Sequence, residues 1–379
     1  MSPPLLLGLS AALHLYIGAR LIPPLSGTVL PAVVAVMLVC SAVLVPLGMF
    51  ARRIVRPPRG DALAGAGLFF LGLFSSLLVS TFLRDVLLLL WSAVAALAPG
   101  AMAPGELARL SAPVALWLAV LATLLGFLNA RRTARVKHVR VPVSGLPAGL
   151  EGFTIVQISD IHVGPTSRGP YGQGIVEAVT RLQPDVVAIT GDLVDGSVAD
   201  LGQHVAPLSG LVARHGSYFV TGNHEYYSGA LPWIAELGRL GIRVLHNEHV
   251  VIHRSGEKLV LAGVPDYSAG HFHADHRSDP GAAIAGAPAD AGVKVLLAHQ
   301  PRSAPAAAQA GFDVQISGHT HGGQFWPWIH FVRFQQPFTA GLHRLDALSV
   351  YVSRGTGYWG PPKRFGAPSE ITRLMLVAA

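Results

Sequence analysis

The hydrophobic residues of this chain are distributed in two ways. Residues 5–22, 27–50, 62–83 and 112–130 form nearly unbroken apolar runs, and a weaker run covers 86–104. A helix needs about 20 apolar residues to cross a bilayer, which is the length of the four stronger runs. Buried core helices are the alternative, but several such runs in succession with almost no charge argue against it. We therefore expect residues 1–130 to be a multi-span transmembrane helical region.

Basic residues follow two of these runs and predict how the helices cross. Positive residues are retained in the cytoplasm, so an even number of crossings should separate the two basic blocks. Three candidate runs lie between them, and the unbroken apolar part of 86–104 has only about 13 residues. We expect this segment not to cross, which gives four crossings and a cytoplasmic domain. The blocks are Arg52, Arg53, Arg56 and Arg59, then Arg131, Arg132, Arg135, Lys137 and Arg140.

The pattern changes after residue 140 to short apolar runs that alternate with amphipathic segments. Residues 131–150 are interpreted as a basic linker and domain entry, and residues 151–379 as a separate domain. Alternation of strands and helices predicts an α/β fold, and the closely spaced later strands predict a second sheet. Helices are expected at 172–183, 201–213 and 230–240. Strands are expected at 153–159, 186–190, 217–220, 243–246, 258–264, 293–298, 313–317, 348–353 and 371–377.

Polar side chains recur directly after the predicted strands. Ligands bind at the carboxyl ends of strands in α/β sheets, so these residues are expected to converge. Carboxylate, imidazole and amide oxygen together suit Mn²⁺, Fe²⁺ or Zn²⁺. One such pair could be accidental, since a single histidine is more often structural, but five in succession are not readily explained that way. The clusters are Asp160 with His162, Asp192, Asn223 with His224, His299, and His319 with His321.

These five clusters resemble the signature of the calcineurin-like metallophosphoesterases: Asp-x-His, Gly-Asp, Gly-Asn-His-Asp/Glu, a later His, and Gly-His-x-His. The resemblance covers about residues 150–379 and implies a four-layer α/β/β/α sandwich with a two-metal site. It also implies roles for the residues. One metal is expected on Asp160, His162 and His321, the other on Asn223, His299 and His319, with Asp192 bridging and His224 acting on the phosphoryl or leaving-group oxygen.

The implied chemistry is hydrolysis of a phosphodiester or pyrophosphate by a metal-bridging hydroxide. Manganese is the metal most expected to support activity in vitro. The multi-span region and the sequence Gly-His-Thr-His-Gly-Gly-Gln at 318–324 are similar to the transmembrane metallophosphoesterases, some of which cleave a UDP-diacylglucosamine lipid precursor. Two alternatives remain: a non-catalytic membrane sensor or transport partner that retains the fold, and a tethered phosphodiesterase for soluble substrates.

The expected partners are the lipid bilayer and a phosphorylated substrate, with a lipidic one among the candidates. The formal charge of +7 resides largely beside the apolar runs, and no basic-aromatic module for nucleic acid is present. An aromatic stretch at 325–331 follows the last His pair. It could contact lipid, because tryptophan favours the membrane interface, or it could pack on the domain's own core.

Overall fold

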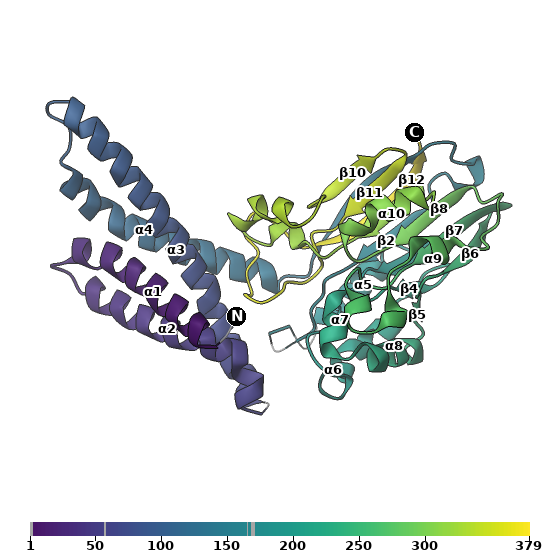
Figure 1. Ribbon diagram of the computed structural model, residues 1–379, viewed down its shortest axis with the longest axis horizontal. Helices are drawn as coiled ribbons and strands as arrows, with labels where there is room; N and C mark the ends of the chain where they lie inside the picture. Colours follow the sequence, from purple (N-terminus) through teal and green to yellow (C-terminus); the bar gives the residue numbers. More distant parts are fainter. Residues whose placement is uncertain (1–2, 57, 165, 168–170) are drawn as a thin grey trace. The chain divides into compact units, whose positions relative to one another are not determined.

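The computed structural model describes residues 3–56, 58–164, 166–167 and 171–379. The chain forms two compact units (Figure 1). The first, called here the helical unit, comprises Met1–Arg131 and Gly360–Phe365. The second, the sheet unit, comprises Arg132–Trp359 and Gly366–Ala379.

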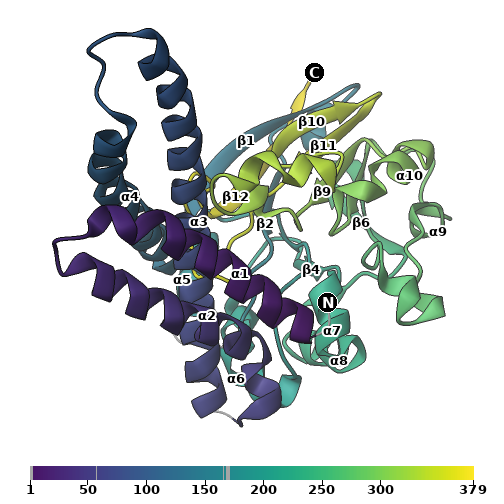
Figure 2. The same cartoon turned by 60° about the vertical axis from the view of Figure 1, so that its left-hand side comes forward.

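The described residues of the helical unit include four helices that are long and apolar enough to cross a membrane. They are α1 Pro3–Leu21, α2 Leu30–Ile54, α3 Arg59–Leu97 and α4 Pro104–Arg131. Helices α1 and α2 lie side by side (Figure 2), and α3 packs on both α2 and α4. Where α2 meets α3, Gly48 and Gly67 are opposed so closely that a Cβ on Gly67 would lie 2.6 Å from the Cα of Gly48. Small residues of this kind let apolar helices approach closely without a polar core.

Helix α3 differs from the expectation drawn from its sequence. The sequence predicts two separate apolar runs, 62–83 and 86–104, with Arg84 and Asp85 between them. In the structure one helix continues through this charged pair to Leu97. Neighbouring helices supply the partners. The guanidinium of Arg84 donates to the Ser111 hydroxyl at 3.0 Å, and the carboxylate of Asp85 accepts from Arg20 at 2.8 Å. A charge inside an apolar helix is tolerated when it is paired in this way.

The segment Gly360–Phe365 belongs to the helical unit although it lies near the end of the chain. The buried ammonium of Lys363 donates to the Gly72 carbonyl of α3 at 3.1 Å and to the Ser76 hydroxyl. The amide of Arg364 donates to the Gly126 carbonyl of α4 at 2.8 Å. The late segment is therefore packed against the third and fourth helices.

The described part of the sheet unit forms two six-stranded sheets. The first follows the order β1-β12-β2-β3-β4-β5, in which β2 to β5 are parallel and β12 is antiparallel to β2. Its strands are β1 Arg135–Val143, β2 Thr154–Ile158, β3 Val186–Ile189, β4 Ser217–Phe219, β5 Arg243–Val244 and β12 Glu370–Ala378.

The second sheet follows the order β10-β11-β9-β8-β7-β6, in which β7, β8, β9 and β11 are parallel. Its strands are β6 Glu248–Arg254, β7 Glu257–Gly263, β8 Val293–Leu297, β9 Val314–Ser317, β10 Gly341–Leu345 and β11 Leu348–Val352. Side chains from the inner faces of both sheets, among them Ile155 and Leu261, form one shared core.

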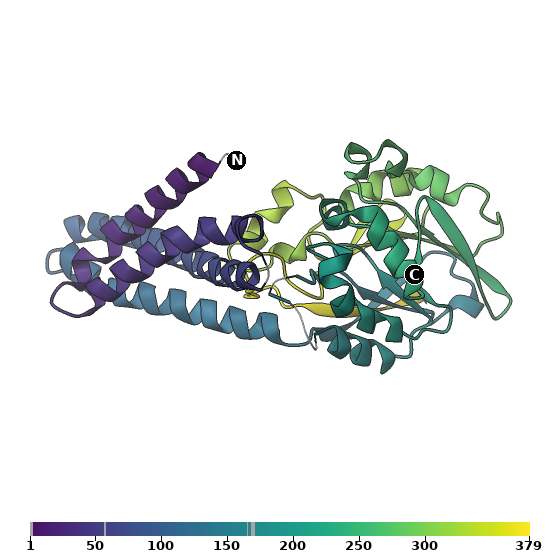
Figure 3. The same cartoon turned by 90° about the horizontal axis from the view of Figure 1, so that it is seen from below.

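Helices cover the outer face of each sheet (Figure 3). Residues of α5, α6 and α8 pack on the first sheet, and residues of α9 and α10 pack on the second. The predicted α/β/β/α sandwich is therefore confirmed. The helices are α5 Tyr171–Thr180, α6 Val198–Val205, α7 Asn223–Ser228, α8 Ala230–Arg239, α9 Pro280–Ile284 and α10 Ala304–Gln309.

Several elements differ from the sequence prediction. Residues 131–150, expected to be a linker, contain β1, which pairs in parallel with β12 along its whole length. Three basic side chains make this strand resemble a linker, although Val141 and Val143 alternate inward. Strands β6 and β10 and the short helices α7, α9 and α10 were not expected either. The 201–213 helix ends early at Val205 and continues as one 3₁₀ segment.

Candidate metal centre

The predicted ligands all lie just beyond the carboxyl ends of parallel strands. In the first sheet, Asp160 and His162 follow β2, Asp192 follows β3, and Asn223 begins α7 after β4. In the second sheet, His299 follows β8, and His319 and His321 follow β9. Because these strands run parallel within each sheet, their carboxyl ends share one edge. The topology therefore gathers residues that are up to 161 positions apart in the sequence, from 160 to 321.

One group of donors consists of Asp160, His162 and His321, whose ligand atoms lie within 4.8 Å of one another. The Nε2 atoms of the two histidines face each other at 3.1 Å. The carboxylate of Asp160 lies 3.5 Å from Nε2 of His321 and accepts the backbone amide of His319 at 2.9 Å. Imidazole nitrogens and one carboxylate oxygen thus point into a common space.

A second group consists of Asp192, His299 and His319, again with ligand atoms within 4.8 Å. The Asp192 carboxylate lies 3.1 Å from Nε2 of His299 and 3.8 Å from Nε2 of His162, which belongs to the first group. Asp192 therefore stands between the two groups. Among the described residues, the amide oxygen Oδ1 of Asn223 is buried and has no hydrogen-bond partner. A buried oxygen without a partner is costly unless an ion or water satisfies it.

Two histidines are oriented by hydrogen bonds at their other ring nitrogen. Nδ1 of His299 lies 2.7 Å from the carbonyl oxygen of Thr190, so Nδ1 donates to that oxygen and Nε2 is the nitrogen that faces Asp192 and the donor groups. Nδ1 of His162 lies 3.1 Å from the Asp195 carboxylate and donates to it, which leaves Nε2 to face the donor group. Metal-binding histidines are commonly fixed by a carbonyl or carboxylate in this way.

The backbone of the site is strained. Asp160, His162, Asp192, His319 and His321 have φ values between 51° and 71°, in the left-handed region. Residues other than glycine seldom adopt this conformation, and it costs of order 1–3 kcal/mol at each position. Half of the ten described non-glycine residues with positive φ are predicted ligands. Such strain is typical of functional sites, where the surrounding structure holds it in place.

Two motif glycines are required by close packing around the ligands. A Cβ on Gly222 would lie 2.2 Å from the Asp192 carboxylate, and a Cβ on Gly318 would lie 2.3 Å from the Asp160 carboxylate. No side chain fits at either position without displacing a ligand. The glycines of Gly-Asn-His and Gly-His-x-His therefore allow the loops to meet.

Asp195 is a site residue that the sequence reasoning did not identify. Its Oδ1 lies 2.6 Å from Nδ1 of His224 and 3.1 Å from Nδ1 of His162. One carboxylate thus orients both a predicted ligand and the predicted catalytic histidine. Its position three residues after Asp192, in Gly-Asp-Leu-Val-Asp, was the available signal.

Glu225 joins the loops that follow β3 and β4. Its buried carboxylate accepts backbone amides from Asp192 at 3.0 Å, Leu193 at 2.8 Å and Gly222 at 2.6 Å. The loop after β3 is thereby joined to the loop after β4. The backbone amide of His224 in turn donates to Asp192 at 2.8 Å, which fixes the carboxylate between the two donor groups.

Charges and burial alter the pKa values of the site. Burial disfavours the protonated ring of His224, but the hydrogen bond with Asp195 and the charges of Asp192 and Asp195 outweigh it and raise its pKa to about 9. Burial and the neighbouring His299 lower the pKa of His319 to about 3. A histidine ligand must be neutral, which the low pKa of His319 favours, whereas Asp192 outweighs burial and raises the pKa of His299, so His299 must lose a proton to bind a metal.

The donor set fits two divalent cations. Each group offers imidazole nitrogen and carboxylate oxygen, Asp192 is available to both, and the buried Asn223 oxygen lacks a partner. This mixture of ligands is typical of Mn²⁺, Fe²⁺ and Zn²⁺ sites. His224 lies beside them, its ring 4.6 Å from that of His162.

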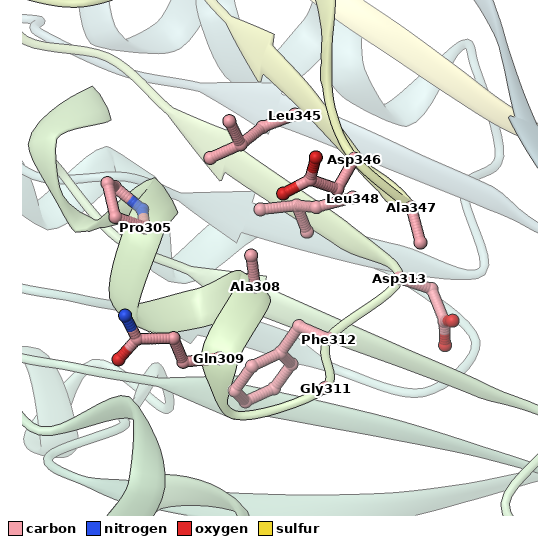
Figure 4. A pocket seen from close by; sticks show the side chains of 10 residues that line it. All are labelled: Pro305, Ala308, Gln309, Gly311, Phe312, Asp313, Leu345, Asp346, Ala347 and Leu348. Atoms are coloured by element: carbon pink, nitrogen blue, oxygen red, sulfur yellow. The ribbon is translucent and has the colours of Figure 1, made fainter.

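A separate depression of about 430 Å³ lies between α10 and the turn from β10 to β11 (Figure 4). It is lined by apolar and acidic side chains, including Pro305, Phe312 and Asp346. None of the predicted ligands lines it. The candidate chemistry therefore lies at the strand ends and not in this depression.

Comparison with known proteins agrees with this geometry. Residues 153–323 match the family model described as calcineurin-like phosphoesterase. The chain is 42% identical to a bovine (Bos taurus) transmembrane protein with metallophosphoesterase domain, over 70% of this chain and 62% of that protein. It is 32% identical to an uncharacterized metallophosphoesterase of Aquifex aeolicus, over 66% of this chain and 95% of that protein.

Among solved structures, NAD nucleotidase of Haemophilus influenzae superposes on 54% of this chain and 50% of its own, with 16% identity and a TM-score of 0.40. The bovine relative and the four apolar helices indicate a membrane protein. The match to the Aquifex protein spans 95% of that relative. The chain therefore belongs to the calcineurin-like phosphoesterase family.

Proposed function

We propose that this protein is a membrane-anchored phosphohydrolase that uses two divalent metal ions to cleave a phosphodiester or pyrophosphate bond. The observation that carries the proposal is the pair of donor groups that share Asp192, together with the buried Asn223 oxygen that has no partner among the described residues. Two adjacent cations supply Lewis acidity and a water of lowered pKa for attack on phosphorus. We propose Mn²⁺, Fe²⁺ or Zn²⁺, with Mn²⁺ the first choice in vitro.

The protein's own side chains would orient the reaction. Asp160, His162 and His321 would hold one ion, and Asn223, His299 and His319 the other. His224 is held by Asp195 through Nδ1, which leaves Nε2 to donate a proton to the leaving oxygen. Rings of Tyr227 and Trp359, with centroids 5.2 Å and 5.7 Å from that of His224, restrict its movement.

The preferred substrate is an amphiphilic phosphoester at the bilayer surface, and lipid-linked pyrophosphates belong to this class. Support comes from the four apolar helices and from the bovine relative, which is named as a transmembrane protein. We also propose that the sheet unit lies on the cytoplasmic face. Two helices, α3 and α4, lie between the two basic blocks, and an even number of crossings is what the positive-inside rule requires.

A reporter fused after Val141 that fluoresces only in the cytoplasm tests this orientation. We expect a fluorescent fusion, because both basic blocks should remain on that side. The same reporter fused after Thr28, between α1 and α2, should be dark. The reverse pattern would place the sheet unit outside the cytoplasm.

Purified full-length protein in detergent with Mn²⁺ should hydrolyse both bis-p-nitrophenyl phosphate and a lipid pyrophosphate. Hydrolysis of the soluble diester alone would favour a tethered enzyme for soluble substrates. No hydrolysis of either compound, with Mn²⁺, Fe²⁺ or Zn²⁺ supplied, would favour the non-catalytic sensor.

Asp192→Ala should lose both metal ions and reduce hydrolysis of the diester by roughly 10³-fold or more, because this carboxylate faces both donor groups. Elemental analysis of the purified variant measures the metal content. Asp290→Ala removes an exposed carboxylate that pairs with Lys258, and it serves as the matched control. A full metal content in Asp192→Ala would contradict the shared position.

His224→Ala should keep its metal but lose about 10²–10⁴-fold in kcat, as expected for the loss of a proton donor.

Asp195→Asn should behave differently, because Asp195 also orients His162: kcat should fall and metal affinity should weaken by about 10–100-fold. Metal titrations separate the two variants, with His204→Ala on α6 as the control. Equal metal affinity in both variants would remove Asp195 from the support of His162.

A further inference from the structure

A row of exposed aromatic side chains follows directly after the last predicted ligand. The aromatic segment, defined here as residues 325–334, begins four positions after His321 and contains two short 3₁₀ turns in which no residue is buried. Its most exposed rings are Phe331 at 52% and Phe334 at 74%. Their neighbours Trp326 and Trp328 are also exposed. Clustered apolar exposure of this kind marks a contact surface in a folded protein.

The aromatic segment is fixed at its base to two particular residues. The side chain of Gln324 donates to the Trp359 carbonyl and accepts the Trp359 amide, both at 2.8 Å. Phe325 forms a β-bridge with Gly366. Trp359 and Gly366 are the residues immediately before and after Gly360–Phe365, the late segment that packs within the helical unit.

The chain itself joins the base of the aromatic segment to the late segment. Arg364 is bonded through its backbone to Gly126 and accepts the side-chain amide of Asn129 at 3.3 Å, near the end of α4. Gly366 is only two residues further, which allows at most about 7 Å between the Cα atoms. Helix α4 ends at Arg131, where the apolar run gives way to the basic block. That change of composition marks the level of the bilayer surface.

We propose that the aromatic segment lies in the headgroup layer of the bilayer and receives the hydrocarbon part of an amphiphilic phosphoester drawn from that bilayer. Tryptophan and phenylalanine rings suit this layer. The segment carries Arg333 and His330 and no acidic residue, so its charge is compatible with lipid phosphates. The inference rests on the proposed function for its substrate but not for its membrane contact.

The position of the segment restricts the substrate. Its first exposed ring, Trp326, follows the metal ligand His321 by five residues, and the Gly322-Gly323 turn between them brings the chain round sharply with φ values of 58° and 78°. Five residues span at most about 18 Å, so one amphiphilic molecule can reach both the donor groups and the rings. Phosphoesters with an alkyl chain attached close to phosphorus fit this arrangement.

Fluorescence quenching tests the membrane contact in the full-length protein. Cys40 is replaced by Ser, and bimane is attached to Cys introduced by Phe334→Cys or, as a control, by Val212→Cys, a 65% exposed site elsewhere on the sheet unit. In nanodiscs, brominated lipids should quench the Phe334 label and spare the Val212 label. Three outcomes would each overturn the contact: a Phe334 label quenched only by aqueous iodide, one quenched by neither agent because protein covers it, or equal lipid quenching of both labels.

Kinetics test the substrate class with a matched pair, dodecyl p-nitrophenyl phosphate and methyl p-nitrophenyl phosphate. The double variant Phe331→Ser with Phe334→Ser should lower kcat/KM for the dodecyl ester roughly tenfold and leave the methyl ester unchanged. Val212→Ser is the control. Equal loss on both esters, or no loss on either, would overturn the substrate assignment. If the wild-type protein hydrolyses neither ester, the proposed function fails, while the quenching result still decides the membrane contact.

Discussion

The close approach of five loops at the carboxyl ends of two sheets is the constraint on which the candidate site depends. Each loop brings a polar side chain to the same small volume, and five of these residues adopt left-handed backbone conformations to do so. The cost is offset by the buried carboxylate of Glu225, which binds three amides of two loops, and by glycines that leave room for the ligand carboxylates. The shared core fixes the two sheets against each other. The loops at their strand ends therefore cannot separate without exposing that core.

Every member of the two donor groups is among the residues predicted from the sequence, because each lies just after the carboxyl end of a predicted strand. Any polar residue just after a buried parallel strand reaches the same sheet edge, and the resemblance supplied the roles. Asp195 could not be assigned in this way, since its orientation depends on how the loop after β3 turns back towards His162 and His224. Strand β1 was missed for a different reason: its basic side chains resemble a linker, whereas pairing with β12 and burial of Val141 and Val143 in the shared core stabilise it.

In the helical unit, the pattern of apolar residues did not predict where helix α3 ends. Arg84 and Asp85 resemble an end of one span and the start of another, yet Arg20 on α1 pairs with Asp85, Ser111 on α4 accepts from Arg84, and α3 continues. Hydropathy counts the charges on one helix and has no information about those on its neighbours. The same reason explains why the Gly48 and Gly67 contact and the buried Lys363 are not apparent from sequence: each depends on a partner distant in the chain.

The late segment Gly360–Phe365 has a consequence for biosynthesis. Helices α3 and α4 leave the ribosome more than 200 residues before Lys363, which fills the space beside Gly72 and Gly126. Until translation reaches that point, part of the packing surface of these two helices stays uncovered. Helices α3 and α4 therefore acquire their final packing only after most of the sheet unit has been made, which couples assembly of the helical unit to synthesis of the unit that follows it.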